Sequence, residues 1–186
     1  MNAHLKGEKE IANIVRLLGK LMRKNLEVGR ERAPLKEEIE MIRSYLEIQK
    51  FRYEDRLMYE INFDAKAAEV LIPPLIIQPL VENSVVHGLE NKEGTVHVYV
   101  SVMMQENEIQ VNVSDDGVGM SSQRLAEIME VITKAEEEQR SRIGMRNVHQ
   151  RLVLYYGEKH GLKIASEEGR GTEISFSIPN DNDYKQ

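Results

Sequence analysis

The chain has 186 residues, which is enough for one globular domain with an added arm or for two very small domains. Its 41% hydrophobic and 30% charged residues exclude wholesale disorder, and the absence of cysteine excludes disulfides, cysteine-bound zinc, iron–sulfur clusters and a thiol nucleophile. A formal net charge of −6 argues against a basic nucleic-acid surface, so a bound anion must be held by local geometry.

The first quarter of the chain is predicted to be helical. Apolar residues at three- and four-residue steps place a stripe along a first helix between Ile11 and Met22. Gly29 to Pro34 interrupts this pattern, and a second helix follows with an apolar face made of Leu35, Ile39, Ile42 and Leu46. The two helices form a predicted hairpin, which is either an ordinary packed pair or a dimerisation or docking arm.

From Leu57 onward the predicted elements are mixed. Strands are expected over Leu57 to Phe63, Val96 to Met104, Ile109 to Val113, Leu162 to Ser166 and Ile174 to Ile178. Helices are expected over Leu75 to His87, after Gly119 and after Gly144. Because most strands alternate apolar and polar residues, the sheet should have one covered face, which predicts an α+β fold with a two-layer sandwich. No apolar run reaches the ~20 residues of a membrane span, and the N-terminus lacks a signal core.

The segment Asp115-Asp-Gly-Val-Gly119 directly follows a predicted strand. Its two glycines allow the backbone to turn sharply and to approach a ligand closely. An ionised carboxylate at a strand end accepts hydrogen bonds from an exocyclic amine such as that of adenine. Taken alone, the segment is equally compatible with a plain loop, and it matches neither the Rossmann nor the Walker pattern.

A second candidate is Gly144, which opens a predicted helix. The free N–H groups of a helix start favour phosphate, and Arg140, Arg142 and Arg146 lie within reach of the same anion. The alternative is a capping glycine among solvated arginines. A third segment, Gly169-Arg-Gly-Thr172, is by itself a predicted hairpin turn.

A fourth candidate lies on the helix that contains Glu82, Asn83 and His87. Asn83 and His87 are four residues apart and share a face, while Glu82 projects about a quarter-turn away. An amide oxygen is a suitable magnesium ligand when substrate phosphates supply further oxygens. The alternative is that Asn83 braces a buried helix and that His87 is an ordinary helix-end histidine.

In this order, the motifs resemble the ATP-binding domain of the superfamily named after gyrase, the heat-shock chaperone, histidine kinase and MutL (the GHKL superfamily, or Bergerat fold). Within it, the chain is similar to sensor histidine kinases of the LytS/YesM type over about Lys9 to Pro179. The segments that carry this resemblance are Leu35–Ile39, Tyr45–Arg52, Ile72–Leu75, Gln78–Asn83, His87–Gly88, Asp115–Gly119, Gly144–Val148, Arg151–Leu152 and Gly171–Thr172.

The resemblance implies a role for each motif. Asn83 would bind a magnesium ion that bridges the ATP phosphates, with Glu82 as a second catalytic residue. Asp115 would hydrogen-bond the adenine amine. The remaining residues implied to contact ATP are His87, Gly117, Gly119, Arg142, Gly144, Met145, Arg146 and Thr172. The segment from Met120 to Ile143 would form a mobile lid. Many relatives carry a basic residue where this chain has Val86, so the identity of the phosphate-binding cation stays open.

The resemblance also implies a domain organisation. Residues 1–56 would be the end of a dimerisation and phosphotransfer region, residues 57–180 the ATP-binding catalytic domain, and residues 181–186 a flexible tail. The acceptor signature of the subfamily, Pro-His-Phe-Leu followed by Asn, is absent, and His4 does not match it. We therefore expect a fragment of a membrane-bound bacterial receptor that begins just after its phosphoacceptor histidine, with no autophosphorylation by itself.

The expected function is transfer of the ATP γ-phosphate to that upstream histidine, in a cytoplasmic region that meets the membrane only through the missing part. The expected partners are ATP, the phosphoacceptor segment, a response regulator and a second copy of the receptor, without nucleic acid. One alternative is a non-catalytic module that senses nucleotide or dimerises. Another is a hydrolysing ATPase or an anti-sigma serine kinase, but Pro79 stands where those relatives place the glutamate that acts as general base.

Overall fold

The computed structural model describes residues 12–19, 30–90, 92–133 and 143–180. Residues 12–19 are helical, and Leu17 among them is buried with 4% of its surface exposed. The first predicted helix is thus confirmed over this part, and its remaining residues lie outside the described ranges.

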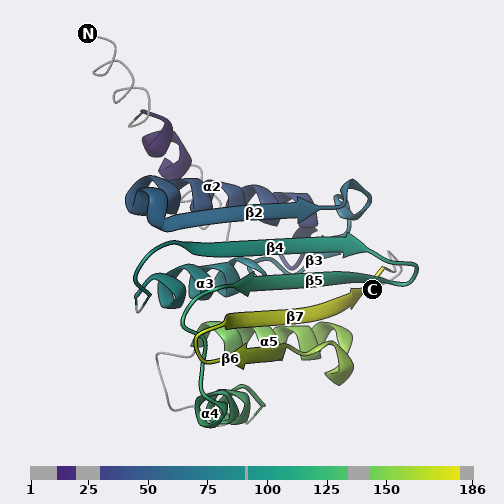
Figure 1. Ribbon diagram of the computed structural model, residues 1–186. Helices are drawn as coiled ribbons and strands as arrows, with labels where there is room; N and C mark the ends of the chain where they lie inside the picture. Colours follow the sequence, from purple (N-terminus) through teal and green to yellow (C-terminus); the bar gives the residue numbers. More distant parts are fainter. Residues whose placement is uncertain (1–11, 20–29, 91, 134–142, 181–186) are drawn as a thin grey trace.

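A five-stranded sheet forms one layer of the molecule (Figure 1). Its strands, in spatial order, are β2 (Leu57–Phe63), β4 (Val96–Met104), β5 (Glu108–Asp115), β7 (Gly171–Pro179) and β6 (Lys163–Glu167). β2 pairs parallel to β4, and the other neighbours pair antiparallel. A separate two-stranded pairing joins β1 (Ala33–Pro34) to β3 (Leu71–Ile72).

Helices form the second layer. Figure 1 shows α2 (Leu35–Tyr53), α3 (Gln78–Glu90) and α5 (Ile143–Tyr156) on one face of the sheet. α4 (Ser122–Thr133) contacts α5 and β6 at one edge. The predicted α+β two-layer sandwich is therefore confirmed. Among the described residues, we find no helix with both the length and the apolar character that crossing a membrane requires.

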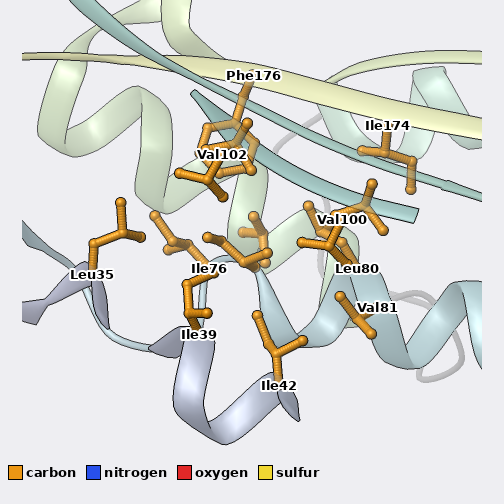
Figure 2. Close-up of a cluster of buried hydrophobic side chains, with 14 of the residues drawn as sticks. Leu35, Ile39, Ile42, Ile76, Leu80, Val81, Val100, Val102, Ile174 and Phe176 are labelled. Carbon is orange, nitrogen blue, oxygen red and sulfur yellow. The ribbon is translucent and has the colours of Figure 1, made fainter. Parts of the chain in front are cut away.

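The core lies between the two layers and is built by the alternation that the sequence predicted. Along β4, Val96, Val98 and Val100 are buried, while His97 and Tyr99 between them are not. Figure 2 shows how side chains of α2, α3 and the sheet meet in one cluster, which includes Leu35, Ile39, Ile42, Ile76, Leu80, Val81, Val100, Val102, Ile174 and Phe176. α2 is thus part of this core, and the domain boundary expected near Arg56 stays a prediction.

The bounds of several predicted elements were wrong, and the strands expected over Ile109 to Val113 and Ile174 to Ile178 are longer, at Glu108–Asp115 and Gly171–Pro179. The helix expected over Leu75 to His87 begins at Gln78 and ends at Glu90. Its early start fails because Leu75 has a φ of 61°, and a left-handed residue does not continue a right-handed helix. Pro79 is the second helical residue, where a missing N–H costs no intrahelical bond. The strand expected over Leu162 to Ser166 is shifted by one residue to Lys163–Glu167.

Candidate nucleotide site

A cavity of about 820 Å³ opens between the helices and one end of the sheet. This volume is in the range of sites for drug-sized ligands and cofactors. Of the predicted catalytic and ATP-contacting residues, the structure brings seven to its wall: Asn83, His87, Asp115, Gly119, Gly144, Met145 and Thr172. They come from α3, β5, the turn after β5, the start of α5 and β7. The tertiary structure therefore joins segments that are far apart in the sequence.

α3 forms the helical wall of this cavity. Asn83 and His87 both line it, as expected for residues four apart on one helical face. Glu82 is not among the lining residues, and its carboxylate instead accepts a 2.8 Å hydrogen bond from Nε2 of Gln78. Burial, with a smaller contribution from the charge of Glu82, raises the pKa of Tyr45 on α2. Glu82 thus lies on the side of α3 that faces α2.

Asp115 ends β5 and lines the opposite wall. It stands opposite Thr172 in the β5–β7 register, and Oδ1 accepts a 3.0 Å hydrogen bond from the Gly117 N–H. Burial raises its pKa above the ordinary value of 3.8, although hydrogen bonds from Gly117 and Ser84 oppose that rise. A partly desolvated carboxylate forms stronger hydrogen bonds than one in water, so this group is well suited to hold an amine donor of a ligand.

Close backbone approach explains the glycines of the turn that follows Asp115. Gly119 has a φ of 63°, and a Cβ on it would lie 2.0 Å from the carbonyl oxygen of Glu167. A Cβ on Gly117 would lie 2.8 Å from the Cα of Gly88 on α3. Gly117 is not a lining residue, so its contribution is to let the turn pack against α3.

The start of α5 forms the third wall. Gly144 and Met145 line the cavity, and the first N–H groups of an α-helix have no partner within the helix. Arg146 lies in the same turn, but it is half-buried and is not among the lining residues. Arg140 and Arg142 lie outside the described residues, as do residues 134–142 of the predicted lid. The part of that segment that the structure describes contains α4.

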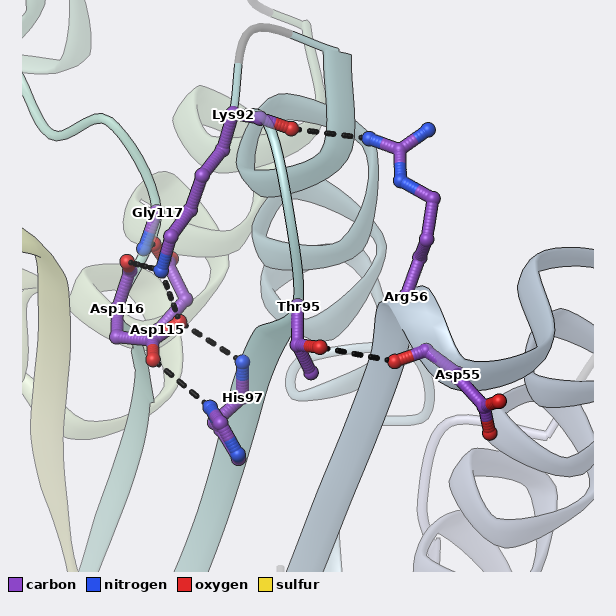
Figure 3. A network of polar contacts seen from close by, with 8 residues as sticks. All are labelled: Asp55, Arg56, Lys92, Thr95, His97, Asp115, Asp116 and Gly117. Carbon is purple, nitrogen blue, oxygen red and sulfur yellow. Dashed lines mark hydrogen bonds and ion pairs between the residues drawn. The ribbon is translucent and has the colours of Figure 1, made fainter.

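Asp116 anchors the strand end that carries Asp115 (Figure 3). Its carboxylate accepts 2.8 Å hydrogen bonds from the backbone N–H of His97 and from His97 Nδ1, and it pairs with Lys92 at 3.0 Å. Burial alone would raise the pKa of Asp116, but these hydrogen bonds lower it below the ordinary value. Nearby, the Arg56 guanidinium donates to the carbonyls of Leu89 in the last turn of α3 and of Lys92 after it. The loop between α3 and β4 is therefore tied to both neighbouring strands.

Several lining residues were missed by the sequence analysis. Ser84 lies beside Asn83, and its hydroxyl helps to lower the pKa of Asp115 against the effect of burial. Arg124 and Ile128 face the cavity from α4, and Nη1 of Arg124 also pairs with Glu127 at 3.2 Å. The four-residue spacing of Arg124 and Ile128 is a signal that the sequence does contain. Which face of α4 meets the cavity was not evident without the packing of that helix.

The donor groups at the cavity fit magnesium only in combination with a phosphorylated ligand. Within the described residues, no group of three or more histidine or acidic side chains is arranged to hold a metal ion. Asn83 offers one amide oxygen at the cavity wall. Magnesium commonly takes one or two protein ligands and completes its shell with waters and substrate phosphates. Asn83 fits that arrangement.

Two family models match the chain. One describes the histidine kinase-, DNA gyrase B-, and HSP90-like ATPases and matches residues 73–182. The other describes histidine kinases and matches residues 1–57. The first match includes every lining residue of the cavity, and the second includes α2.

Among curated proteins, the chain is similar to three sensor proteins of bacteria. It is 31% identical to the sensor histidine kinase YesM of Bacillus subtilis over 92% of this chain and 28% of that protein. It is 37% identical to the sensor histidine kinase YpdA of Escherichia coli over 88% of this chain and 27% of that protein. It is 30% identical to the sensor protein LytS of Bacillus subtilis over 84% of this chain and 26% of that protein. The chain thus spans little more than a quarter of these relatives.

Solved structures agree on the fold. The catalytic domain of the histidine kinase ThkA matches with a TM-score of 0.59 at 14% identity, over 80% of this chain and 95% of that domain. The histidine kinase domain of a blue-light-activated kinase from Erythrobacter litoralis matches with a TM-score of 0.56 at 15% identity, over 91% of this chain and 74% of that one. Together with the cavity and its motifs, the family match shows that this chain belongs to the histidine kinase-, DNA gyrase B-, and HSP90-like ATPase family.

Proposed function

We propose that this chain is the ATP-binding catalytic region of a sensor histidine kinase, and that the cavity binds ATP. The observation that supports this most strongly is the partly buried carboxylate of Asp115 at one end of a cavity in a domain of this family. Gly144 and Met145 at the helix start line another wall, where backbone N–H groups favour phosphate. An acidic chain can hold a polyphosphate there because the attraction is local.

The proposed reaction transfers the γ-phosphoryl group of ATP to a histidine on another segment of the receptor. The bond between the γ-phosphorus and its bridging oxygen breaks, a bond from phosphorus to an imidazole nitrogen forms, and ADP leaves. Asp115 would hold the adenine, and Thr172 would line the adenine side. Asn83 would hold magnesium, which neutralises phosphate charge when bound. The protein then contributes mainly by positioning and by stabilising charge.

Further parts of this proposal concern the whole receptor. A kinase of this type would act on a phosphoacceptor segment of the same receptor and would pass the phosphate to a response regulator. The receptor would be a homodimer, with this region in the cytoplasm and another region attached to the membrane. Glu82 faces Gln78 and α2, so a direct catalytic role would require it to move. The hydrolysing ATPase is the weaker alternative because Pro79 occupies the position of the general base. The remaining alternative is a non-catalytic module that binds nucleotide. Only a phosphotransfer assay distinguishes it from a kinase, because both would bind ATP.

Nucleotide binding tests the first half of the proposal. Magnesium with a non-hydrolysable ATP analogue should raise the melting temperature of the protein, and calorimetry should give a dissociation constant. Asp115→Asn should weaken binding by about 10- to 100-fold, because a hydrogen bond to a charged group contributes about 1.5–3 kcal/mol. Asn83→Ala should remove most of the magnesium dependence.

Asp116→Asn is the matched control, because its carboxylate faces His97 and Lys92 and is not among the cavity-lining residues. It should lower stability and leave the affinity within about threefold. Absence of any nucleotide effect on the wild type would refute the assignment. For catalysis, a separate segment carrying the acceptor histidine should take up labelled γ-phosphate. If it does not, while ATP still binds, the non-catalytic module is favoured.

A further inference from the structure

A buried carboxylate of α2 lies against the start of α3. Glu38 has only 4% of its surface exposed. Its Oε1 accepts a 2.6 Å hydrogen bond from the Ile77 N–H and a 3.1 Å hydrogen bond from the Gln78 N–H. These N–H groups belong to the end of a helix, where the helix itself offers no acceptor. Glu38 therefore satisfies them across a separation of 39 and 40 residues.

The segment before α3 is also held from a second side. Nη1 of Arg151 on α5 donates a 2.6 Å hydrogen bond to the Pro74 carbonyl. Between these two contacts, Leu75 has a φ of 61°, a strained conformation for a residue with a branched side chain. Such strain persists only where surrounding contacts impose it. The position of the α3 start is thus imposed by α2 and α5 and does not arise from its local sequence.

The bonds made by Glu38 do not require it to be charged. Burial outweighs the hydrogen bonds from Ile77 and Gln78 and raises the pKa of Glu38 to about 7. Oε1 can accept in both forms, since the proton can sit on Oε2. Oε2 is buried and has no hydrogen-bond partner among the described residues. A glutamine at this position would accordingly preserve both bonds to α3.

The same helix carries the ligand-facing residues of the cavity. Asn83 lies five residues after Gln78, or about 7.5 Å along the helix axis, and His87 lies one turn further. A shift or tilt at the α3 start would therefore move both side chains relative to Asp115 on the sheet. We propose that Glu38 is a positioning residue that ties α2 to the start of α3, so that nucleotide affinity depends on the docking of α2.

This inference rests on the proposed function, but it adds a connection between two parts of the chain. Glu38 lies within residues 1–57, which match the histidine kinase model, whereas Ile77 and Gln78 lie within residues 73–182, which match the ATPase model. The bonds between them cross from one family unit to the other. A displacement of α2 would therefore change the position of Asn83, although α2 itself need not contact the nucleotide.

The test compares variants of Glu38 in the 186-residue chain by calorimetry with magnesium and a non-hydrolysable ATP analogue. Glu38→Leu removes the acceptor, and we expect its dissociation constant to rise at least tenfold. Glu38→Gln keeps the acceptor and should stay within about threefold of the wild type. Glu38→Asp shortens the side chain by one methylene and should weaken binding measurably. This last variant serves if Glu38→Leu does not fold.

A purely structural role is excluded by two further measurements. Val102→Ala removes core volume on β4 and lowers stability without touching α3 through a polar contact. Its affinity should match that of the wild type even where its melting temperature falls as far as that of Glu38→Asp. Amide hydrogen exchange should rise in the first turns of α3 in Glu38→Asp and stay unchanged in β4 and β5.

Two outcomes would overturn the inference while leaving the proposed function intact. The first is wild-type affinity in Glu38→Asp and in any folded Glu38→Leu protein. The second is an equal loss of affinity in Val102→Ala. If the wild type itself does not bind the nucleotide, the proposed function fails first, and that result is recognised before any variant is compared.

Discussion

The strand side and the helical side of the cavity are held in place by different kinds of contact. On the strand side, Asp115 and Thr172 face each other in the β5–β7 register, and the turn at Gly119 packs directly on the backbone of Glu167. On the helical side, the α3 start is positioned by Glu38 and the preceding segment by Arg151, across separations of 39 and 77 residues. The strand side is fixed by backbone pairing, whereas the helical side depends on side chains from other helices.

The largest expected effect is on the strand side. Gly119→Ala would place a Cβ 2.0 Å from the Glu167 carbonyl at a residue with a φ of 63°. We expect the free energy of unfolding to fall by about 3 kcal/mol or more, because both the backbone strain and the steric overlap must be relieved. Urea denaturation measures this change. An unchanged midpoint would mean that the strand side tolerates displacement and that the contrast between the two sides is wrong.

The contribution of the helical side to the free energy of unfolding should depend on pH. Burial raises the pKa of Glu38 to about 7 from the ordinary value of 4.5. Because the pKa of Glu38 is higher in the folded protein than in the unfolded chain, its contribution to the free energy of unfolding is fully present below the pKa of the unfolded chain. This contribution is lost as the pH rises through the pKa of the folded protein. The window is therefore about pH 4.5 to 7. Tyr156 and Arg151, both on α5, are the other ionisable groups that act electrostatically together with Glu38.

Glu38→Gln is the variant that isolates this effect. Glutamine resembles the protonated form, so its stability relative to the wild type should increase between pH 5 and pH 8. The expected gain is on the order of 2–3 kcal/mol, from a shift of this size at 1.36 kcal/mol per pKa unit. The pKa values of Asp115 and Asp116 are shifted in opposite directions and also affect stability. Their contributions cancel when the variant and the wild type are compared at the same pH, because both proteins contain them. A difference that stays constant with pH would show that the pKa of Glu38 is not raised, so that burial does not outweigh its hydrogen bonds to the α3 start.

The smallest expected effect concerns the glycine on the helical side. A Cβ on Gly144 would meet only the Pro79 Cβ, at an ordinary 3.8 Å. Gly144→Ala should therefore stabilise the free protein by about 0.5 kcal/mol, since alanine has the higher helix propensity. Thermal unfolding without nucleotide measures this gain. Destabilisation comparable to that of Gly119→Ala would show that both sides of the cavity are equally tightly packed.

Much of the fold follows from local sequence patterns. The predicted bounds of β2 and β4 coincide with the observed ones, because alternation of side chains along a strand depends only on neighbouring residues. The same holds for the shared face of Asn83 and His87. Asp115 and Gly119 were candidates for a ligand-facing turn because glycine permits close backbone approach and a strand-end carboxylate accepts hydrogen bonds, but a plain loop was equally compatible until the order of the motifs was considered.

Other features depend on contacts that no local pattern contains. The sequence alone predicted the layers of the fold, the order of the motifs and part of the residues that line the cavity. Only the tertiary structure decided that Glu82 faces Gln78, that Arg124 reaches the cavity and that Glu38 is buried against the start of α3. The physical reason is that periodicity arises within one element, whereas burial and long-range hydrogen bonds arise from what packs against it.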